Sequence, residues 1–353
     1  MAEIRVAEDA EPATLGAFDM IIDARSPGEF AVDHIPGAVN LPVLSDAERA
    51  EVGTIYVQES RFKARRIGAA YVARNVAQHL QTAMADWPGS QQPLVYCWRG
   101  GMRSNAMAVI LAQVGWRTAV LAGGYRTYRR RVVQRLYEAH PVPKVVVLDG
   151  PTGSGKTEVL AHLAALGVQA LDLEALAAHR GSLLGALPGT PQPSQKLFES
   201  RLLAELERLD LSRPIVVEAE SSKVGQRMVP PVLWSAMDAA PRISLLAPPE
   251  ARARYLAQNY GELGRDPDAL IPLLARLPDR LGRKRLEAWA DLARAGETEA
   301  LAADLIEAHY DPAYRRSSRE RNGRVIGEVA LGRLDAEAFD EAARKIAGLV
   351  GGA

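Results

Sequence analysis

Cysteine is scarce in this chain, and the scarcity excludes an internal disulfide. Cys97 is the only cysteine among 353 residues, so no two thiols can pair within one chain. The six histidines are scattered and show no zinc-ligand spacing with Cys97. We therefore expect no metal site made of protein ligands, and any thiol chemistry has to use this one sulfur atom.

Long hydrophobic runs are missing as well. No stretch reaches the roughly eighteen apolar residues of a membrane span, and the N-terminus lacks the charged-then-apolar pattern of a secretory signal. We expect a cytoplasmic protein with no membrane partner. Hydrophobic residues still make up 48% of the chain, enough for the cores of two or three domains, so a soluble globular enzyme is the expected class.

Net charge of either sign is also absent, because 43 basic residues balance 43 acidic ones. Arginine far outnumbers lysine among the basic residues. Guanidinium groups bind phosphates and stack on bases, so this excess suits RNA binding, but a GC-rich genome produces the same bias without any function.

The hydrophobic pattern predicts two α/β domains. Two prolines between Leu136 and Lys144 interrupt helical periodicity, so we predict a first domain over residues 8–136, a linker over 137–143 and a second domain over 144–353. Short apolar runs that alternate with helical spacing indicate a parallel sheet in each domain. The expected strands are 20–23, 94–97, 144–149, 214–218 and 242–247, and the expected helices are 69–82, 104–114 and 157–166. From about Pro248 onward the sequence is mainly helical, with 325–326 as the one candidate strand.

Cys97 ends an apolar run and precedes a glycine-containing loop and a helix. The backbone N–H groups of such a loop and the positive end of the helix favour the thiolate, and nearby arginines add positive charge. The alternative is a buried structural cysteine, for which the residues that follow would be a poor setting. We predict that Cys97 is catalytic and that an anion cradle follows it, made of Trp98, Arg99, Gly100, Gly101, Met102 and Arg103.

A phosphate-binding loop opens the second domain. The pattern Gly-x₄-Gly-Lys-Thr at 150–157 follows an apolar strand and precedes a helix, which is the context of a Walker A loop. Its glycines let backbone N–H groups approach phosphate oxygens, Lys156 neutralises them, and Thr157 would contact Mg²⁺ if one is bound. The usual second element, a strand ending in aspartate, is replaced by Ile215–Glu220, so the match supports nucleotide hydrolysis less than phosphate binding. The predicted diphosphate-binding residues are Gly150, Gly153, Ser154, Gly155, Lys156 and Thr157.

Four segments of the first domain occur in the order typical of one known fold. They are Ile22–Phe30, Asp33–Asn40, the Cys97 loop and Leu121–Tyr125, and together they resemble a rhodanese domain. Rhodanese-like domains carry sulfur or selenium on their cysteine. The Cys-x₅-Arg spacing from Cys97 to Arg103 is also that of cysteine-dependent phosphatases on related folds, so the loop alone leaves the chemistry open. The expected fold is a rhodanese-like domain followed by a P-loop NTPase-like domain with a helical C-terminal region.

Further segments after the P-loop extend the resemblance. Asp172–Glu174, His179–Ser182, Gln192–Glu199 and Glu218–Ser221 follow in order, and about residues 10–330 resemble the tRNA 2-selenouridine synthase family. The resemblance implies that selenium replaces the sulfur of wobble 2-thiouridine in tRNA, with selenophosphate as the selenium donor. It also implies an S-geranyl-2-thiouridine intermediate made with geranyl diphosphate.

On this resemblance the protein is a transferase, both a selenotransferase and a geranyltransferase acting on tRNA. Cys97 would carry selenium as a selenylsulfide, and the P-loop would hold the diphosphate of the prenyl donor, so ATP need not be the ligand. Selenophosphate and geranyl diphosphate are substrates, and no tightly bound cofactor is expected. tRNA with wobble 2-thiouridine is the expected partner, and an enzyme that supplies selenophosphate is a further candidate.

Two further sets of residues are candidates for the site. Each of these residues could instead have an ordinary structural role. Polar residues of the family-like segments could serve the reaction or act as caps and ion pairs: Asp172, Glu174, His179, Arg180, Glu218 and Glu220. Arginines near the domain junction and toward the C-terminus could neutralise tRNA phosphates or form a solvated helix surface: Arg126, Arg129, Arg130, Arg131, Arg315, Arg316 and Arg319.

Two other functions stay open at this point. One is a rhodanese-type sulfurtransferase fused to an ATP-dependent kinase or RNA thiolation domain, which would hydrolyse nucleotide at the P-loop. The other is a nucleotide-binding module in which Cys97 senses redox state. Each leaves one set of family-like residues without a role, so the tRNA-modifying enzyme is favoured.

Overall fold

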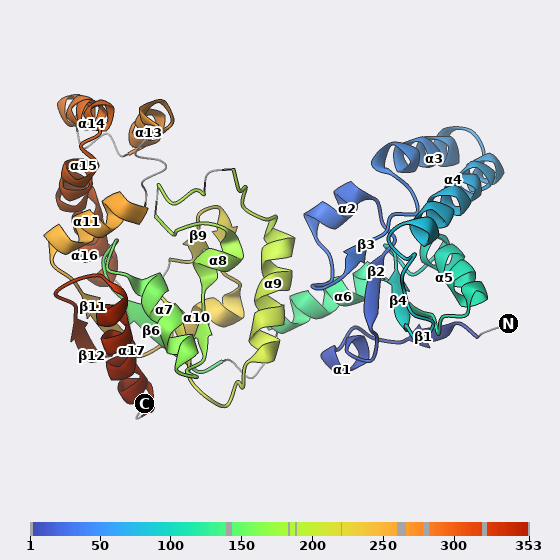
Figure 1. The fold of residues 1–353 in the computed structure, drawn as a ribbon, viewed down its shortest axis with the longest axis horizontal. Coiled ribbons are helices and arrows are strands. Elements are labelled where there is room, and N and C mark those ends of the chain that lie inside the picture. The colour runs from blue at the N-terminus through green and yellow to red at the C-terminus, as the bar shows by residue number, and fades with distance from the viewer. Residues whose placement is uncertain are drawn as a thin grey trace. The chain divides into compact units, whose positions relative to one another are not determined.

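The computed structural model describes residues 3–138, 143–182, 184–187, 189–219, 221–259, 266–277, 282–319 and 323–351. The chain divides into two compact units, one made of Met1–Glu138 with Ser194–Glu207 and the other of Ala139–Pro193 with Arg208–Ala353. Each unit contains one five-stranded parallel sheet with helices packed against it (Figure 1). The predicted α/β class with two parallel sheets and a helical C-terminal part is confirmed.

The sheet of the first unit has the strand order β1-β5-β4-β2-β3, and every neighbouring pair is parallel. Its strands are β1 (Arg5–Ala7), β2 (Met20–Asp23), β3 (Val39–Asn40), β4 (Pro93–Tyr96) and β5 (Ala119–Leu121). Its helices are α1 (Pro12–Leu15), α2 (Pro27–Val32), α3 (Asp46–Gln58), α4 (Arg61–Gln81), α5 (Met102–Val114), α6 (Tyr125–Val133), the π-helix η1 (Gln134–Glu138) and α9 (Gln195–Arg208).

The central strand β4 is buried along its whole length. Val95 of β4 and Ile22 of β2 pack in one apolar cluster with Met107 and Leu111 of α5. This packing holds α5 against the sheet and fixes the loop between β4 and α5, which begins with Cys97.

The sheet of the second unit has the order β12-β11-β6-β8-β7 and is parallel as well. Its strands are β6 (Val145–Asp149), β7 (Ala170–Leu171), β8 (Ile215–Glu218), β11 (Arg242–Leu246) and β12 (Val325–Ala330). Around it lie α7 (Lys156–Ala165), α8 (Leu173–Ala177), the hairpin of β9 (Lys223–Val224) and β10 (Arg227–Met228), α10 (Pro231–Ala239) and α17 (Ala336–Gly351).

The segment between β11 and β12 is helical and has an apolar core of its own around the fully buried Trp289. It comprises α11 (Pro249–Asn259), α13 (Pro267–Leu274), α14 (Arg283–Ala295), α15 (Thr298–Leu305), the π-helix η3 (Ile306–Tyr310) and α16 (Asp311–Arg319). Within the described ranges, no helix is both long and apolar enough to span a bilayer.

Helix α9 departs from the predicted domain division. Ser194–Glu207 lies inside the second predicted domain, 144–353, yet it belongs to the first compact unit. Its apolar residues, among them Phe198 and Leu202, are buried, and its glutamates pair with arginines of α6. The predicted linker 137–143 lies at the end of η1, and residues 139–142 of it are outside the described residues.

Candidate functional site

Cys97 follows β4 directly, at the carboxyl end of the central strand of its sheet. The side chain is buried, and its sulfur lies 3.2 Å from the Ser104 hydroxyl and 3.9 Å from the Gly101 carbonyl oxygen. Ser104 stands in the first turn of α5, one turn beyond the loop. Its hydroxyl donates to the Gly101 carbonyl oxygen at 3.1 Å, and by rotation about its C–O bond it can donate instead to a thiolate and stabilise the negative charge on sulfur. Sequence reasoning did not single out this serine.

Two glycines let the backbone fold closely around Cys97. Gly100 has φ +64°, and a Cβ there would lie 2.7 Å from the carbonyl oxygen of Leu121. Gly124 has φ +60°, and a Cβ there would collide with the carbonyl oxygen of Cys97. The N–H group of Tyr125 donates to that same oxygen at 2.8 Å. The segment 121–125 is therefore part of the site because its turn packs directly against the cysteine loop.

The loop after Cys97 is open to solvent on its outer side. Trp98, Arg99, Gly101 and Met102 are exposed, and Gly100 is half-buried. The four exposed residues line a pocket beside the sulfur together with Cys97 and Arg103, and Gly100 is not part of this lining. Five of the six predicted cradle residues therefore lie around one pocket, and the binding of an anionic donor there stays a prediction.

Arg103 is held by a glutamate that sequence reasoning did not select. Its guanidinium pairs with Glu29 at 2.7 Å, and Glu29 also pairs with Arg49 at 3.0 Å. Burial alone would raise the pKa of Glu29, but the hydrogen bond and charge of Arg103 and the charge of Arg49 hold this pKa below its usual 4.5. Glu29 thus stays ionised and orients Arg103 toward the rim of the loop. Its position in the rhodanese-like segment 22–30 was the available signal.

A buried cluster ties the strand ends beneath the loop. Arg25 is fully buried, pairs with Asp23 at 2.6 Å and stacks on the ring of Tyr125 at 4.1 Å. The hydroxyls of Tyr96 and Tyr125 donate to Asp23 and Asp33 at 2.7 and 2.6 Å. Burial, reinforced by these carboxylates, raises the pKa of both tyrosines, so both remain protonated donors.

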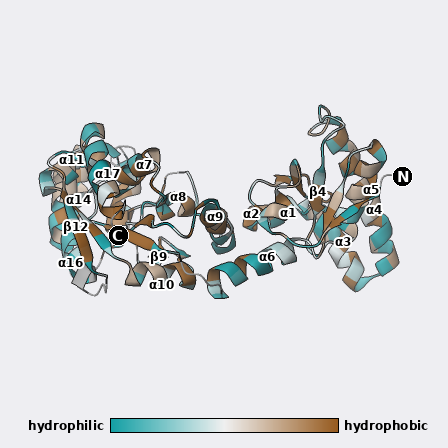
Figure 2. Ribbon diagram, turned by 90° about the horizontal axis from the view of Figure 1, so that it is seen from below, coloured by the Kyte–Doolittle hydropathy of each residue, from teal (hydrophilic) through white to brown (hydrophobic). Residues whose placement is uncertain are grey.

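The predicted tRNA-binding arginines of α6 fall into two groups. Arg126 and Arg130 are exposed, and α6 is largely hydrophilic in Figure 2. The other two are mostly buried and neutralised by acidic residues within the first unit: Arg129 pairs with Glu199, and Arg131 pairs with Glu207 and Glu11. Among the described residues Arg126 and Arg130 show no such ion pair, so these two remain the α6 candidates for contact with RNA phosphates.

The P-loop connects β6 to α7 and is packed from two sides. Gly153 and Gly155 both have φ +81°, which residues with a Cβ rarely adopt. A Cβ at Gly153 would lie 2.8 Å from Leu256 of α11, and one at Gly155 would collide with the ring of Phe339 of α17. Glycine is required at both positions by the backbone conformation and by the space available.

Polar groups of three different elements meet beside the loop. Lys156 donates to the carbonyl oxygen of Gly150 at 2.9 Å, so its ammonium lies across the loop. The Thr157 hydroxyl lies 3.4 Å from a carboxylate oxygen of Glu174, whose backbone N–H donates to Glu218 at 2.9 Å. Oxygen ligands of this kind suit Mg²⁺, which usually takes one or two protein groups together with phosphate oxygens and water. Thr157 and Glu174 therefore fit such an ion.

The remaining polar candidates have different settings. Asp172 is the N-cap of α8 and accepts a hydrogen bond from Ala175 at 2.7 Å, so the capping role is observed. Arg180 lines the P-loop pocket with Glu174. His179 is buried, which lowers its pKa below 6.5.

The C-terminal candidates lie partly outside the described residues. Arg315 and Arg316 are exposed on α16. The side chain of Arg319 and the whole of Glu220 are outside what the structure describes. The two α16 arginines thus stay predictions for tRNA contact, together with the exposed pair on α6.

Arg252 links the P-loop to the helical C-terminal region. Its side chain is 2% exposed and forms a bidentate ion pair with Asp311 at 2.8 Å. It also donates to the carbonyl oxygen of Thr152 at 3.3 Å. Nothing in the local sequence distinguishes Arg252 from the many surface arginines, so pattern reasoning missed it.

The two centres define a class of protein, in which a cysteine loop of rhodanese type and a P-loop occur in one chain. The family model described as a rhodanese-like domain matches residues 9–131. The model described as the tRNA 2-selenouridine synthase AAA domain matches residues 143–266.

Curated relatives match most of the chain. The tRNA 2-selenouridine synthase of Aeromonas salmonicida is 34% identical, and the match covers 87% of this chain and 89% of the relative. The one of Nitrosomonas europaea is 35% identical, with 74% and 70% covered, and that of Pseudomonas syringae pv. syringae is 32% identical, with 86% and 90% covered. The chain belongs to the tRNA 2-selenouridine synthase family, which confirms the resemblance found in the sequence.

Proposed function

We propose that this protein is a tRNA 2-selenouridine synthase that exchanges the sulfur of wobble 2-thiouridine for selenium from selenophosphate. The exchange passes through S-geranyl-2-thiouridine, made with geranyl diphosphate. The observation that carries the proposal is the pairing of a buried thiol in a glycine-lined loop with a complete P-loop, in a chain of this family. The sulfurtransferase–kinase and the redox module would also use both centres, but each leaves one set of family-like residues without a role.

The P-loop serves the prenyl step in this proposal. The thiouridine sulfur attacks the first carbon of the geranyl group, an S–C bond forms, and the C–O bond to diphosphate breaks. Pyrophosphate leaves with the bonding electrons, and the uridine loses a proton. Lys156 and the loop N–H groups stabilise the charge that develops on the leaving oxygen. Mg²⁺, when held by Thr157 and Glu174, would supply further positive charge there.

Cys97 serves the selenium step. A thiocarbonyl sulfur leaves poorly, whereas alkylated sulfur departs as geranyl thiol after a selenium nucleophile adds to the ring carbon. Cys97 carries selenium as a selenylsulfide: its thiolate attacks the selenium of selenophosphate, an S–Se bond forms, and the Se–P bond breaks with its electron pair leaving on phosphorus as phosphite. Because the chain has no second cysteine, two molecules of an external thiol then reduce the selenylsulfide. They form one disulfide, release hydrogen selenide as the nucleophile and regenerate the Cys97 thiolate, which the Ser104 hydroxyl at 3.2 Å supports.

The exposed arginines are proposed to hold the tRNA backbone. Arg126 and Arg130 on α6 and Arg315 and Arg316 on α16 are accessible to phosphates. Binding through such contacts weakens with rising salt, since each contact releases counterions.

The test is mass spectrometry of nucleosides from thiolated tRNA incubated with the full chain. Geranyl diphosphate alone should yield S-geranyl-2-thiouridine, and later addition of selenophosphate with a thiol should convert it to 2-selenouridine. RNA-stimulated ATP hydrolysis without either product would contradict the proposal and favour the kinase-type alternative.

A further inference from the structure

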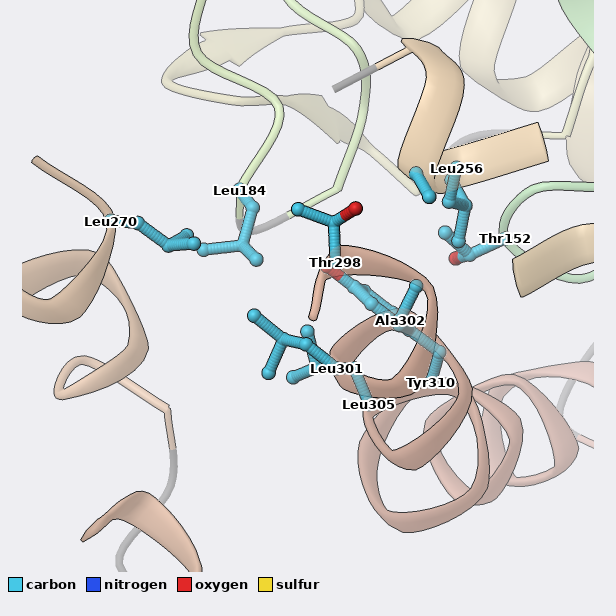
Figure 3. A pocket seen from close by; sticks show the side chains of 10 residues that line it. Thr152, Leu184, Leu256, Leu270, Thr298, Leu301, Ala302, Leu305 and Tyr310 are labelled. Atoms are coloured by element: carbon cyan, nitrogen blue, oxygen red, sulfur yellow. The ribbon is translucent and has the colours of Figure 1, made fainter. Parts of the chain in front are cut away.

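An apolar pocket adjoins the P-loop and has no part in the chemistry described so far. The space among its lining side chains, counted out to the open solvent, is about 540 Å³, and most of the lining is aliphatic. The side chains come from α11, α13, α15 and η3, with contributions from Thr152 and Leu184. Figure 3 shows them directed toward a shared space, with Thr152 and Leu256 at one side and Leu184 and Leu270 at the opposite side.

The pocket shares part of its wall with the phosphate site. Thr152, Leu256 and Tyr310 line both the apolar pocket and the pocket over the P-loop. Leu256 also lies against Gly153, the glycine whose space it limits. A ligand with its phosphates in the loop therefore has the apolar lining directly beside it.

The lining chemistry selects the kind of tail. Among the residues that the structure describes, the polar side chains that line the pocket are the hydroxyls of Thr152, Thr298 and Tyr310, and no charged or amide side chain lines it. A ribose or a nucleobase buried here would lose hydrogen bonds to water without replacement, which is costly. A branched hydrocarbon loses none and gains from leaving water.

We propose that this pocket holds the isoprenoid tail of the diphosphate donor, and that Ala302 and Leu270 determine the tail length it accepts. Ala302 of α15 lies nearer the Thr152 side of the pocket, so a larger side chain there reduces the space left for a tail. Leu270 lies on the side away from Thr152, where the end of the tail would stop. This inference rests on the assignment of diphosphate to the P-loop under the proposed function.

The test compares binding of geranyl diphosphate and inorganic pyrophosphate to the full chain by calorimetry. Geranyl diphosphate should bind at least about tenfold more tightly, because its tail buries apolar surface. Ala302→Leu should lower the affinity for geranyl diphosphate by about tenfold and leave that for pyrophosphate unchanged. Ala290→Leu is the matched control, since Ala290 is 7% exposed against 8% for Ala302 and lies on the neighbouring α14, outside the pocket.

A second variant tests the length rule independently. Leu270→Ala enlarges the far side, so the preference should shift from geranyl toward farnesyl diphosphate. Equal affinity for geranyl diphosphate and pyrophosphate in the unmodified protein would overturn the inference. The inference would also be overturned if both pocket variants fold normally and keep the tail preference of the unmodified protein, while Lys156→Ala abolishes binding of both ligands. That result would leave the proposed function standing. Retention of both affinities in Lys156→Ala would instead remove the diphosphate assignment, and the tail pocket with it.

Discussion

Replacing Gly124 by alanine tests whether the turn at 121–125 shapes the cysteine loop. Gly124 has φ +60° and ψ −146°, a region that is almost exclusively populated by glycine, and a Cβ there would collide with the Cys97 carbonyl oxygen. Gly37 is the matched control in the same unit, because it has φ +82° but nothing within 4 Å of the added Cβ. Both variants should lose about 1–3 kcal/mol of stability from backbone strain. Gly124→Ala should lose about 1–3 kcal/mol more, since the obstructing atoms are backbone and cannot turn aside.

Urea denaturation of the full chain measures the difference in unfolding free energy between the two variants. Nucleoside analysis then separates the two reaction steps. Gly124→Ala displaces the loop that carries Cys97, so selenation should fall sharply while geranylation continues. Equal destabilisation by both substitutions would refute the packing argument. If Gly124→Ala lost geranylation but still selenated tRNA that had been geranylated beforehand, the assignment of the selenium step to the Cys97 loop would be refuted.

Three further predictions concern individual side chains. Ser104→Ala should slow selenation by about tenfold to a hundredfold, because the thiolate loses a charge-assisted hydrogen bond. The rate of geranylation should not change, and an equal effect on the rates of both steps would contradict this prediction. Arg252→Ala leaves the partly buried Asp311 without its partner and should lower the free energy of unfolding by about 2–4 kcal/mol, measured by urea denaturation. A loss under about 1 kcal/mol would disprove the role of Arg252 in linking the P-loop to the helical region. Burial lowers the pKa of His179 in the folded state, so the free energy of unfolding should decrease as pH falls below 6.5. His179→Gln should reduce that decrease in a series of denaturation curves from about pH 8 to about pH 5. Identical slopes of unfolding free energy against pH in the two proteins would show that His179 does not contribute.

The P-loop was the part of the fold most accessible to sequence reasoning, because its signals are contiguous. The predicted strand 144–149 is β6 at 145–149, and the predicted helix 157–166 is α7 at 156–165. An apolar strand, a glycine-rich turn and a helix follow one another within about twenty residues, so no long-range contact is needed to recognise them.

Several elements of the sheets and helices gave too weak a signal. The helix α3 at 46–58 buries only Ile55, so it has almost no apolar stripe, and it was not predicted. The strands β1 and β5 have three residues each. Only the first two residues of β12, 325–326, were expected, because Gly327 and Glu328 interrupt the apolar run that becomes a six-residue strand.

The residues of the candidate site differ in the same way: some are recognisable from their neighbours in sequence, and others depend on contacts between distant parts of the chain. Cys97 and its loop were predicted from adjacent residues, whereas Glu29 reaches Arg103 from 74 positions away. The pairing of Arg129 with Glu199 depends on α9 joining the first unit, which no local pattern indicates. Arginine composition alone therefore could not separate residues available to RNA from those already paired inside the protein.

The most direct test of the division of labour uses thiolated tRNA that has been geranylated beforehand. When selenophosphate and a thiol are supplied without geranyl diphosphate, Lys156→Ala should convert this tRNA to 2-selenouridine at nearly the unmodified rate, and Cys97→Ala should leave it unchanged. Selenation by Cys97→Ala, or a need for Lys156 with tRNA that already carries the geranyl group, would contradict the account.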